Sequence, residues 1–134
     1  MNFEELSIGM SCELVKSFSQ DEVKAFALLS MDNNPIHLDR EYAQNSLFKK
    51  NIVHGFLVGS LFSAIIGTKM PGEGSIYLNQ TMVFRKPVYW DQSVKAVVKV
   101  EELYPEKQRA LLSTNCYDED NNLLIEGTAL VKIL

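Results

Sequence analysis

The longest apolar stretch of the chain runs from Ile52 to Gly67 and contains no Asp, Glu, Lys or Arg. On a helix these residues are apolar on nearly every side, which is typical of a helix buried inside a domain. The stretch is too short and too rich in glycine to cross a bilayer. Ser60 and Ser63 are neighbours on one helical face, where a serine either bonds back to the helix backbone or serves a site. We expect a long buried helix here.

Alternation of apolar and polar residues replaces this pattern after the helix and predicts β-strands. The segment Asp118–Asn122 lies between the last two of them and has the composition of a hairpin turn. An antiparallel sheet wrapped around one long central helix is an α+β fold. The expected strands are Ser11–Val15, Ser75–Phe84, Ser93–Val100, Gln108–Tyr117 and Leu123–Ile133.

A shorter helix is predicted to follow Ser19, which has the spacing of a capping box with Glu22. Val23 and Phe26 fall on one face of this helix. Helical geometry is disfavoured in the residue before a proline, so the helix ends ahead of Pro35.

The segment from Asp32 to Asp39 contains two aspartates, one of the two histidines of the chain, two asparagines and a proline. Such a composition is typical of a turn after a helix, and Asp39 is a suitable cap for a short helix at residues 40–46. A plain turn has no use for the aliphatic residues on either side of His37, so the segment is also a candidate to return to the core. Asp32 and His37 can then share one water molecule, as acid–base catalysis near neutral pH requires. Both interpretations remain open at this level.

Composition restricts the class of protein further. The chain has 134 residues, of which 46% are hydrophobic, and this suits a single domain over residues 1–134. The formal charge of −4 argues against a nucleic-acid-binding protein, because no basic excess exists to neutralise phosphates. The first residues lack the basic start and the apolar run of a signal peptide. We therefore expect a cytoplasmic protein without a membrane partner. Cys12 and Cys116 have no metal-ligand spacing, and free thiols are the default in such a compartment.

Four ordered segments match those of a known enzyme family: Asp32–Asp39, Ile52–Gly55, Pro71–Leu78 and Phe84–Val88. The first resembles the hydratase 2 motif of the MaoC-like dehydratases, a family that includes the (R)-specific enoyl-CoA hydratases. The second is similar to the lead-in of their central helix. The resemblance spans essentially the whole chain and departs from the family pattern at Met31, where a small or polar residue is usual.

This resemblance implies a hot-dog fold, with an antiparallel sheet wrapped around the long helix, and a homodimer. It implies reversible syn hydration of a trans-2-enoyl thioester to the (R)-3-hydroxyacyl product, with coenzyme A or acyl carrier protein as the carrier. Asp32 and His37 match the catalytic pair of the family. Gly55 matches the backbone N–H group that holds the thioester oxygen, and Ser63 matches a serine that supports the site. We expect no cofactor and no metal.

The chemistry of these residue types agrees with those roles. Hydration needs a base on water, which Asp32 can supply, and a proton donor at C2, which His37 can supply. A helix N-terminus offers free N–H groups to a developing oxyanion, and Gly55 lets a ligand approach closely. His54, one residue earlier, is expected to be structural, neutral and hydrogen-bonded, because a charged imidazole would oppose the helix dipole.

Basic residues are the expected partners of an anionic carrier. The adjacent pairs are Lys49 with Lys50 and Arg85 with Lys86. The alternative is that these side chains only keep the surface soluble.

The acyl tail is expected to follow the helical face that carries Ser60 and Ser63, with Ile66 limiting the length that fits. The alternative is that Ile66 belongs to the ordinary core.

Other classes of protein fit the sequence less well. A hot-dog acyl-thioesterase shares the fold and the thioester, but a single carboxylate can activate its water without His37. A serine hydrolase needs a nucleophile elbow, and neither serine of the central helix lies in one. A metal site built from Asp32, His37, Asp39 and His54 lacks helical ligand spacing. A non-catalytic acyl-thioester-binding protein has no need of an acid–base pair.

Overall fold

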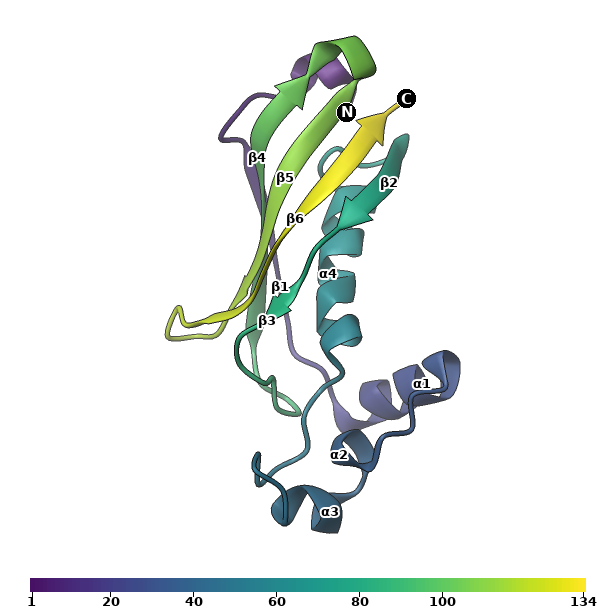
Figure 1. Cartoon of the computed structure of the whole chain (residues 1–134), viewed down its shortest axis with the longest axis vertical. Coiled ribbons are helices and arrows are strands. Elements are labelled where there is room, and N and C mark those ends of the chain that lie inside the picture. The colour runs from purple at the N-terminus through teal and green to yellow at the C-terminus, as the bar shows by residue number, and fades with distance from the viewer.

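The computed structural model describes the whole chain, residues 1–134, as a twisted antiparallel sheet with one long helix against it (Figure 1). The strands are β1 (Ser11–Lys16), β2 (Ser75–Gln80), β3 (Val83–Phe84), β4 (Val94–Tyr104), β5 (Arg109–Tyr117) and β6 (Leu123–Ile133). They lie in the order β1-β4-β5-β6-β2, and β3 also pairs with β6. Because β1 and β2 are at the two ends of this order, both are edge strands.

Alternate residues of the central strands point into the core, as the sequence pattern predicts. In β5 the buried residues are Ala110, Leu112, Thr114 and Cys116, while the residues between them are half-buried. Four of the five predicted strands are confirmed, as β1, β4, β5 and β6. β4 continues to Tyr104, past its predicted end, because its pairing with β5 resumes after a local shift of register.

The expectation of one continuous strand from Ser75 to Phe84 is wrong, because the ladder breaks between β2 and β3. At the break the carbonyl oxygen of Thr81 lies against Gly127 of β6, where a methyl group would come within 1.8 Å of it. The N–H group of Thr81 donates to the carbonyl of Thr128. Only glycine permits so close an approach of two backbones, so the bend depends on Gly127.

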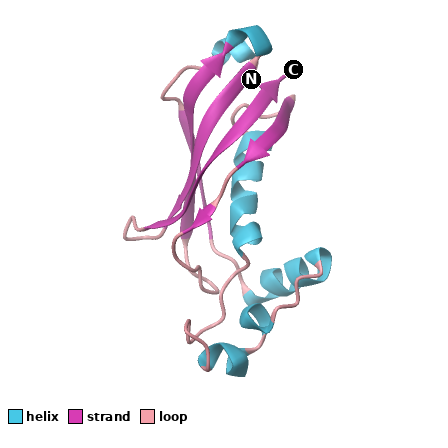
Figure 2. Cartoon of the chain, in the orientation of Figure 1, coloured by secondary structure: helices cyan, strands magenta, loops and turns pink.

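Three short helices lie beyond one end of the sheet, next to the start of the long helix (Figure 2). The first, α1 (Gln20–Ser30), begins with the predicted capping box, in which Ser19 and Glu22 each bond the other's backbone N–H. It ends at Met31, whose φ of 68° is left-handed. The others are α2 (Pro35–Leu38) and α3 (Arg40–Gln44). Asp39 caps α3 by accepting from the N–H of Tyr42, as expected.

The long helix α4 (Gly55–Thr68) packs one face against the sheet and leaves the other exposed. The buried face consists of Val58, Leu61, Phe62, Ile65 and Ile66. The prediction of a helix buried all round is therefore wrong within one chain, since a single sheet covers only one side. None of the helices combines the length and apolarity that crossing a membrane requires.

Candidate active site

Asp32 lies in the short link between α1 and α2, held by local hydrogen bonds. Its N–H donates to the hydroxyl of Ser30, and its carboxylate accepts from the N–H of Asn34 at 3.2 Å. The side chain of Asn34 in turn caps α2 at Ile36, and Pro35 opens that helix with its fixed φ. The carboxylate of Asp32 stays exposed. The turn-like composition is thus what fixes the position of the candidate base.

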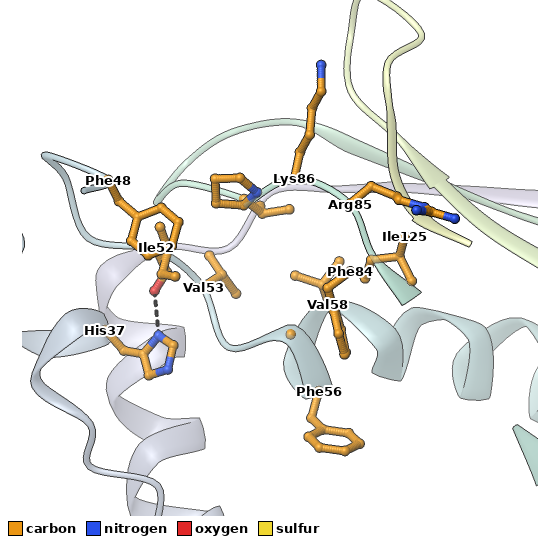
Figure 3. Close-up of a pocket in the computed structure, with 13 residues that line it drawn as sticks. His37, Phe48, Ile52, Val53, Phe56, Val58, Phe84, Arg85, Lys86 and Ile125 are labelled. Carbon is orange, nitrogen blue, oxygen red and sulfur yellow. Dashed lines mark hydrogen bonds between the residues drawn. The ribbon is translucent and has the colours of Figure 1, made fainter. Parts of the chain in front are cut away.

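His37 belongs to the short helix α2, in which both Ile36 and His37 are buried. The Nδ1 atom of His37 lies 2.9 Å from the carbonyl oxygen of Ile52 (Figure 3). Because that carbonyl can only accept, Nδ1 carries the proton and Nε2 is left free. Burial lowers the pKa of His37 below its usual 6.5, against the opposing effects of the Ile52 bond and of Asp32.

His54 joins the two candidate catalytic residues. Its Nε2 atom lies 3.0 Å from the backbone carbonyl of Asp32, and its ring stacks on that of His37 with centroids 3.8 Å apart. The side chain is only 2% exposed, and its Nδ1 atom has no partner. The predicted hydrogen bond of His54 is therefore confirmed.

Asp32, His37 and His54 each bring one potential ligand atom within 4.8 Å of the others. The two imidazole planes differ by only 25°, so their in-plane lone pairs do not converge on one ion. Asp39, the fourth residue of the metal hypothesis, caps α3 instead. The arrangement favours a water molecule between Asp32 and His37.

Gly55 opens α4 beside a cavity of about 380 Å³ that His37 also lines. The N–H groups of Gly55 and Phe56 donate to no acceptor in the chain. A methyl group on Gly55 would come within 2.5 Å of the Phe84 ring, so glycine is needed for packing as well as access. The rest of the lining is mainly apolar and includes Val58 and Ile125 of the core (Figure 3). The cavity suits an apolar group that carries one oxygen acceptor.

The two basic pairs occupy different hollows. Arg85 and Lys86 line the cavity of His37, where Arg85 pairs with Glu126 and Lys86 extends away from the apolar side chains (Figure 3). Lys49 and Lys50 line a second hollow, with the Lys50 ammonium 4.7 Å from the Tyr89 ring.

Three residues of the central helix that were predicted to line the path of the acyl tail do not line the cavity: Ser60, Ser63 and Ile66. Ser60 is exposed and its hydroxyl donates to the carbonyl of Leu57, as the structural alternative predicts. Ser63 is exposed on the same face. The expectation that Ile66 shares this face is wrong: at 100° per residue it turns toward the sheet, where it is 1% exposed.

Sequence reasoning missed two residues that hold α2 in place. The indole N–H of Trp90 donates to the carbonyl of His37 at 3.2 Å. The amide of Asn51 donates to the carbonyls of Ile36 and Asp39 at 2.9 and 3.1 Å, and Asn51 is buried. The only signals available were a single tryptophan and a lone amide before an apolar run.

Comparison with known proteins agrees with this geometry. Residues 5–119 match the MaoC-like domain. The chain is 42% identical over 133 residues to the (R)-specific enoyl-CoA hydratase of Aeromonas caviae, covering 99% of both chains. It is 40% identical to the 3-hydroxybutyryl-CoA dehydratase of Methylorubrum extorquens, covering 98% of this chain and 83% of that one.

The solved structure of the A. caviae (R)-hydratase superposes with a TM-score of 0.95 at 42% identity, covering 98% of this chain and 99% of that chain. The predicted hot-dog fold is therefore confirmed, with the antiparallel sheet packed on α4. The chain belongs to the family of MaoC-like dehydratases.

Proposed function

We propose that the chain is a hydro-lyase that catalyses reversible, (R)-specific hydration of trans-2-enoyl thioesters. One observation carries the proposal: a carboxylate oxygen of Asp32 lies within 4.8 Å of a ring nitrogen of His37, and His37 lines the same cavity as Gly55, whose N–H has no partner. The relatives named as (R)-specific enoyl-CoA hydratase and 3-hydroxybutyryl-CoA dehydratase support the same chemistry.

Water is held by two acceptors. The carboxylate of Asp32 and the Nε2 lone pair of neutral His37 each accept one O–H of the same molecule, which directs an oxygen lone pair toward C3. As the C3–O bond forms, the π electrons of C2=C3 move toward the thioester oxygen. The carboxylate of Asp32 takes up one water proton and passes it to Nε2 of His37, which delivers it to C2. The oxygen and this proton both reach the substrate from the side on which Asp32 and His37 lie, so addition is syn.

The negative charge that reaches the thioester oxygen needs a fixed donor. The N–H group of Gly55 has no other partner and lies at the positive end of α4. Donors of this kind typically contribute about 3 kcal/mol to the transition state. We therefore assign Gly55 to the thioester oxygen.

The acyl tail enters beneath α4 in this proposal. Val58 and Ile125 line the cavity and are also core residues, so the cavity opens toward the buried face of the helix. Val58, Phe62 and Ile66 follow one another at four-residue spacing on that face. Ile66 then limits tail length from the end of this stripe. This path replaces the exposed Ser60 face, and Ser63 keeps a supporting role only as a prediction.

The carrier, coenzyme A or acyl carrier protein, meets the protein at the mouth of the cavity. Lys86 is exposed there and forms no salt bridge, although its charge helps to lower the pKa of Asp118, whereas Arg85 is paired with Glu126. We assign the first contact with carrier phosphate to Lys86. Lys49 and Lys50 stay candidates for a more distant phosphate, because their hollow is separate.

A homodimer is also part of the proposal. The open face of α4 exposes Phe56 and Ala64, and the edge strand β2 exposes Ile76 and Leu78. Exposed apolar surface at a strand edge favours pairing with a second copy. Light scattering should give twice the chain mass, and Ala64→Glu should lower it to that of a monomer. A monomeric wild type with full activity would contradict the dimer.

A single domain over residues 1–134 and a cytoplasmic location remain predictions, the second supported by the free thiols of Cys12 and Cys116.

The function is tested with crotonyl-CoA and purified protein. Loss of the enoyl absorbance should accompany formation of 3-hydroxybutyryl-CoA. A dehydrogenase specific for the (R)-enantiomer should oxidise this product, and one specific for the (S)-enantiomer should not. A thiol reagent run in parallel measures free coenzyme A. Thiol release without loss of the double bond would identify a thioesterase instead, and the absence of both reactions would leave a binding protein.

A further inference from the structure

His54 contacts every part of the proposed catalytic centre. Its Nε2–H donates to the backbone carbonyl of Asp32, its ring stacks on His37, and its own peptide leads directly into Gly55. We propose that His54 is a positioning residue that fixes Asp32, His37 and the Gly55 N–H relative to one another. The inference rests on the proposed hydration activity.

The ring of His54 is itself held firmly. Its other neighbour is Phe26 of α1, whose ring meets it edge-on with centroids 4.9 Å apart. Its backbone carbonyl accepts from the N–H groups of Leu57 and Val58, so it is the N-cap of α4. The His54 ring is thus attached to the first turn of α4 and contacts both Asp32 and His37. His54 therefore connects α4, which packs on the sheet, to the link between α1 and α2 that contains Asp32.

Simple packing does not explain a histidine here. Its Nδ1 atom is buried without a partner, and such an atom lowers stability relative to an apolar group of the same shape. A phenylalanine would fill the space between Phe26 and His37 and leave no unpaired nitrogen. What phenylalanine lacks is the donor to Asp32. Histidine at this position costs stability, because its Nδ1 is unpaired, but it provides the hydrogen bond to Asp32. A stability cost of this kind is typical of a functional position.

Three variants separate these contacts. His54→Phe keeps the aromatic ring and removes the donor. His54→Gln places an amide N–H about where Nε2 lies and loses the ring, while His54→Asn is too short to reach the Asp32 carbonyl. kcat and KM for crotonyl-CoA hydration and the melting temperature are measured for each, with wild type and Asp32→Asn as references.

We expect His54→Phe to melt at or above the wild-type temperature while kcat falls about 10- to 100-fold and KM changes little, since misplacement of catalytic groups by ~1 Å has effects of this size. His54→Gln should recover most of the kcat that His54→Asn loses. The proposal is overturned if folded His54→Phe retains wild-type kcat, or if the Gln and Asn variants have equal kcat. If His54→Phe does not fold, the comparison of His54→Gln with His54→Asn tests the proposal by itself. Failure of the proposed function is distinct, because wild type itself would then not hydrate the substrate.

Discussion

The first turn of α4 and the turns that follow it are surrounded by different kinds of contact. At the start, His54 bonds the Asp32 carbonyl and stacks on His37, and the N–H of Gly55 is free. Further along, Phe62 and Ile65 are fully buried against apolar side chains of the sheet. One apolar helix thus supplies both a catalytic frame and a core. Substitutions at its start should affect turnover, and substitutions further along should affect stability.

The largest expected effect lies at the helix start. Asp32→Asn and His37→Asn should each lower kcat/KM about 10²–10⁴-fold, the usual contribution of general acid–base groups. Both variants should remain folded, because Asp32 is exposed and the asparagine amide can replace Nδ1–H of His37 as donor to Ile52. Crotonyl-CoA hydration and melting curves measure both quantities.

Asp39→Asn is the matched control, since Asp39 is a nearby carboxylate that caps α3 and does not line the cavity. It should keep nearly full activity with slightly reduced stability. Near-wild-type turnover by either Asp32→Asn or His37→Asn would remove that residue from the catalytic pair.

The next effect tests the far end of the buried stripe. Ile66→Ala should lower the free energy of unfolding by about 2–5 kcal/mol, as large-to-small core substitutions do. It should also shift preference toward longer enoyl chains, because the proposed tail path ends there and each buried CH₂ is worth about 0.8 kcal/mol. kcat/KM for four-, six- and eight-carbon substrates is compared with the melting temperature.

Leu112→Ala is the control, because Leu112 is equally buried but belongs to β5. It should lose stability with an unchanged chain-length profile. If Ile66→Ala shows the same unchanged profile, the tail does not reach Ile66 and this residue is ordinary core.

The fold was largely predictable because its signals are local. The capping box at Ser19, the alternation in β5 and the hairpin turn at Asp118–Asn122 each appear in a few adjacent residues. The break after β2 was not predictable, since it depends on contact between Thr81 and Gly127, far apart in the sequence. Composition likewise could not show that α4 has an open face, because hydropathy does not say which surface covers a helix.

The candidate pair was predictable for a similar reason: Asp32 and His37 lie in one short motif. The stacking of His54 on His37 and the hydrogen bond from the Trp90 indole join separate segments of the chain. The spacing of residues in the sequence therefore could not predict these contacts. Ile66 was misplaced because six residues at about 100° each put it about 120° away from Ser60, on the side of the helix that faces the sheet.

A smaller effect is expected at the mouth of the cavity. Lys86→Glu should raise KM for coenzyme A substrates about two- to fivefold, in line with the strength of exposed ion pairs, and high salt should reduce the difference. Lys50→Glu is the comparison, because Lys50 lies in the separate hollow beside Tyr89. Equal KM values for wild type and Lys86→Glu at low salt would leave Lys86 as a solubility residue.

The smallest effect is a change in the titration of His37. The chain has only two histidines, so proton NMR shows two imidazole Hε1 signals, and the His54→Gln variant identifies the one that belongs to His37. The pKa of His37 should lie below 6.5, because burial disfavours its charged form. Removing the Asp32 charge by Asp32→Asn should lower this pKa further, since that charge raises it. His54→Gln should raise it, since the neighbouring imidazole lowers it.

These directions fix the pH dependence. A depressed pKa means that the unfolded chain binds the proton more tightly, so the contribution of His37 to stability is complete above pH 6.5 and is lost as pH falls. The acid limb of kcat/KM should follow the same titration, because only neutral His37 has a lone pair on Nε2 to accept from water. It should move to higher pH in His54→Gln together with the NMR curve. His37 would be excluded from the proton transfer if its titration midpoint lay at or above pH 6.5, or if the acid limb of kcat/KM did not move with that midpoint. The role of His54 would then be limited to positioning Asp32.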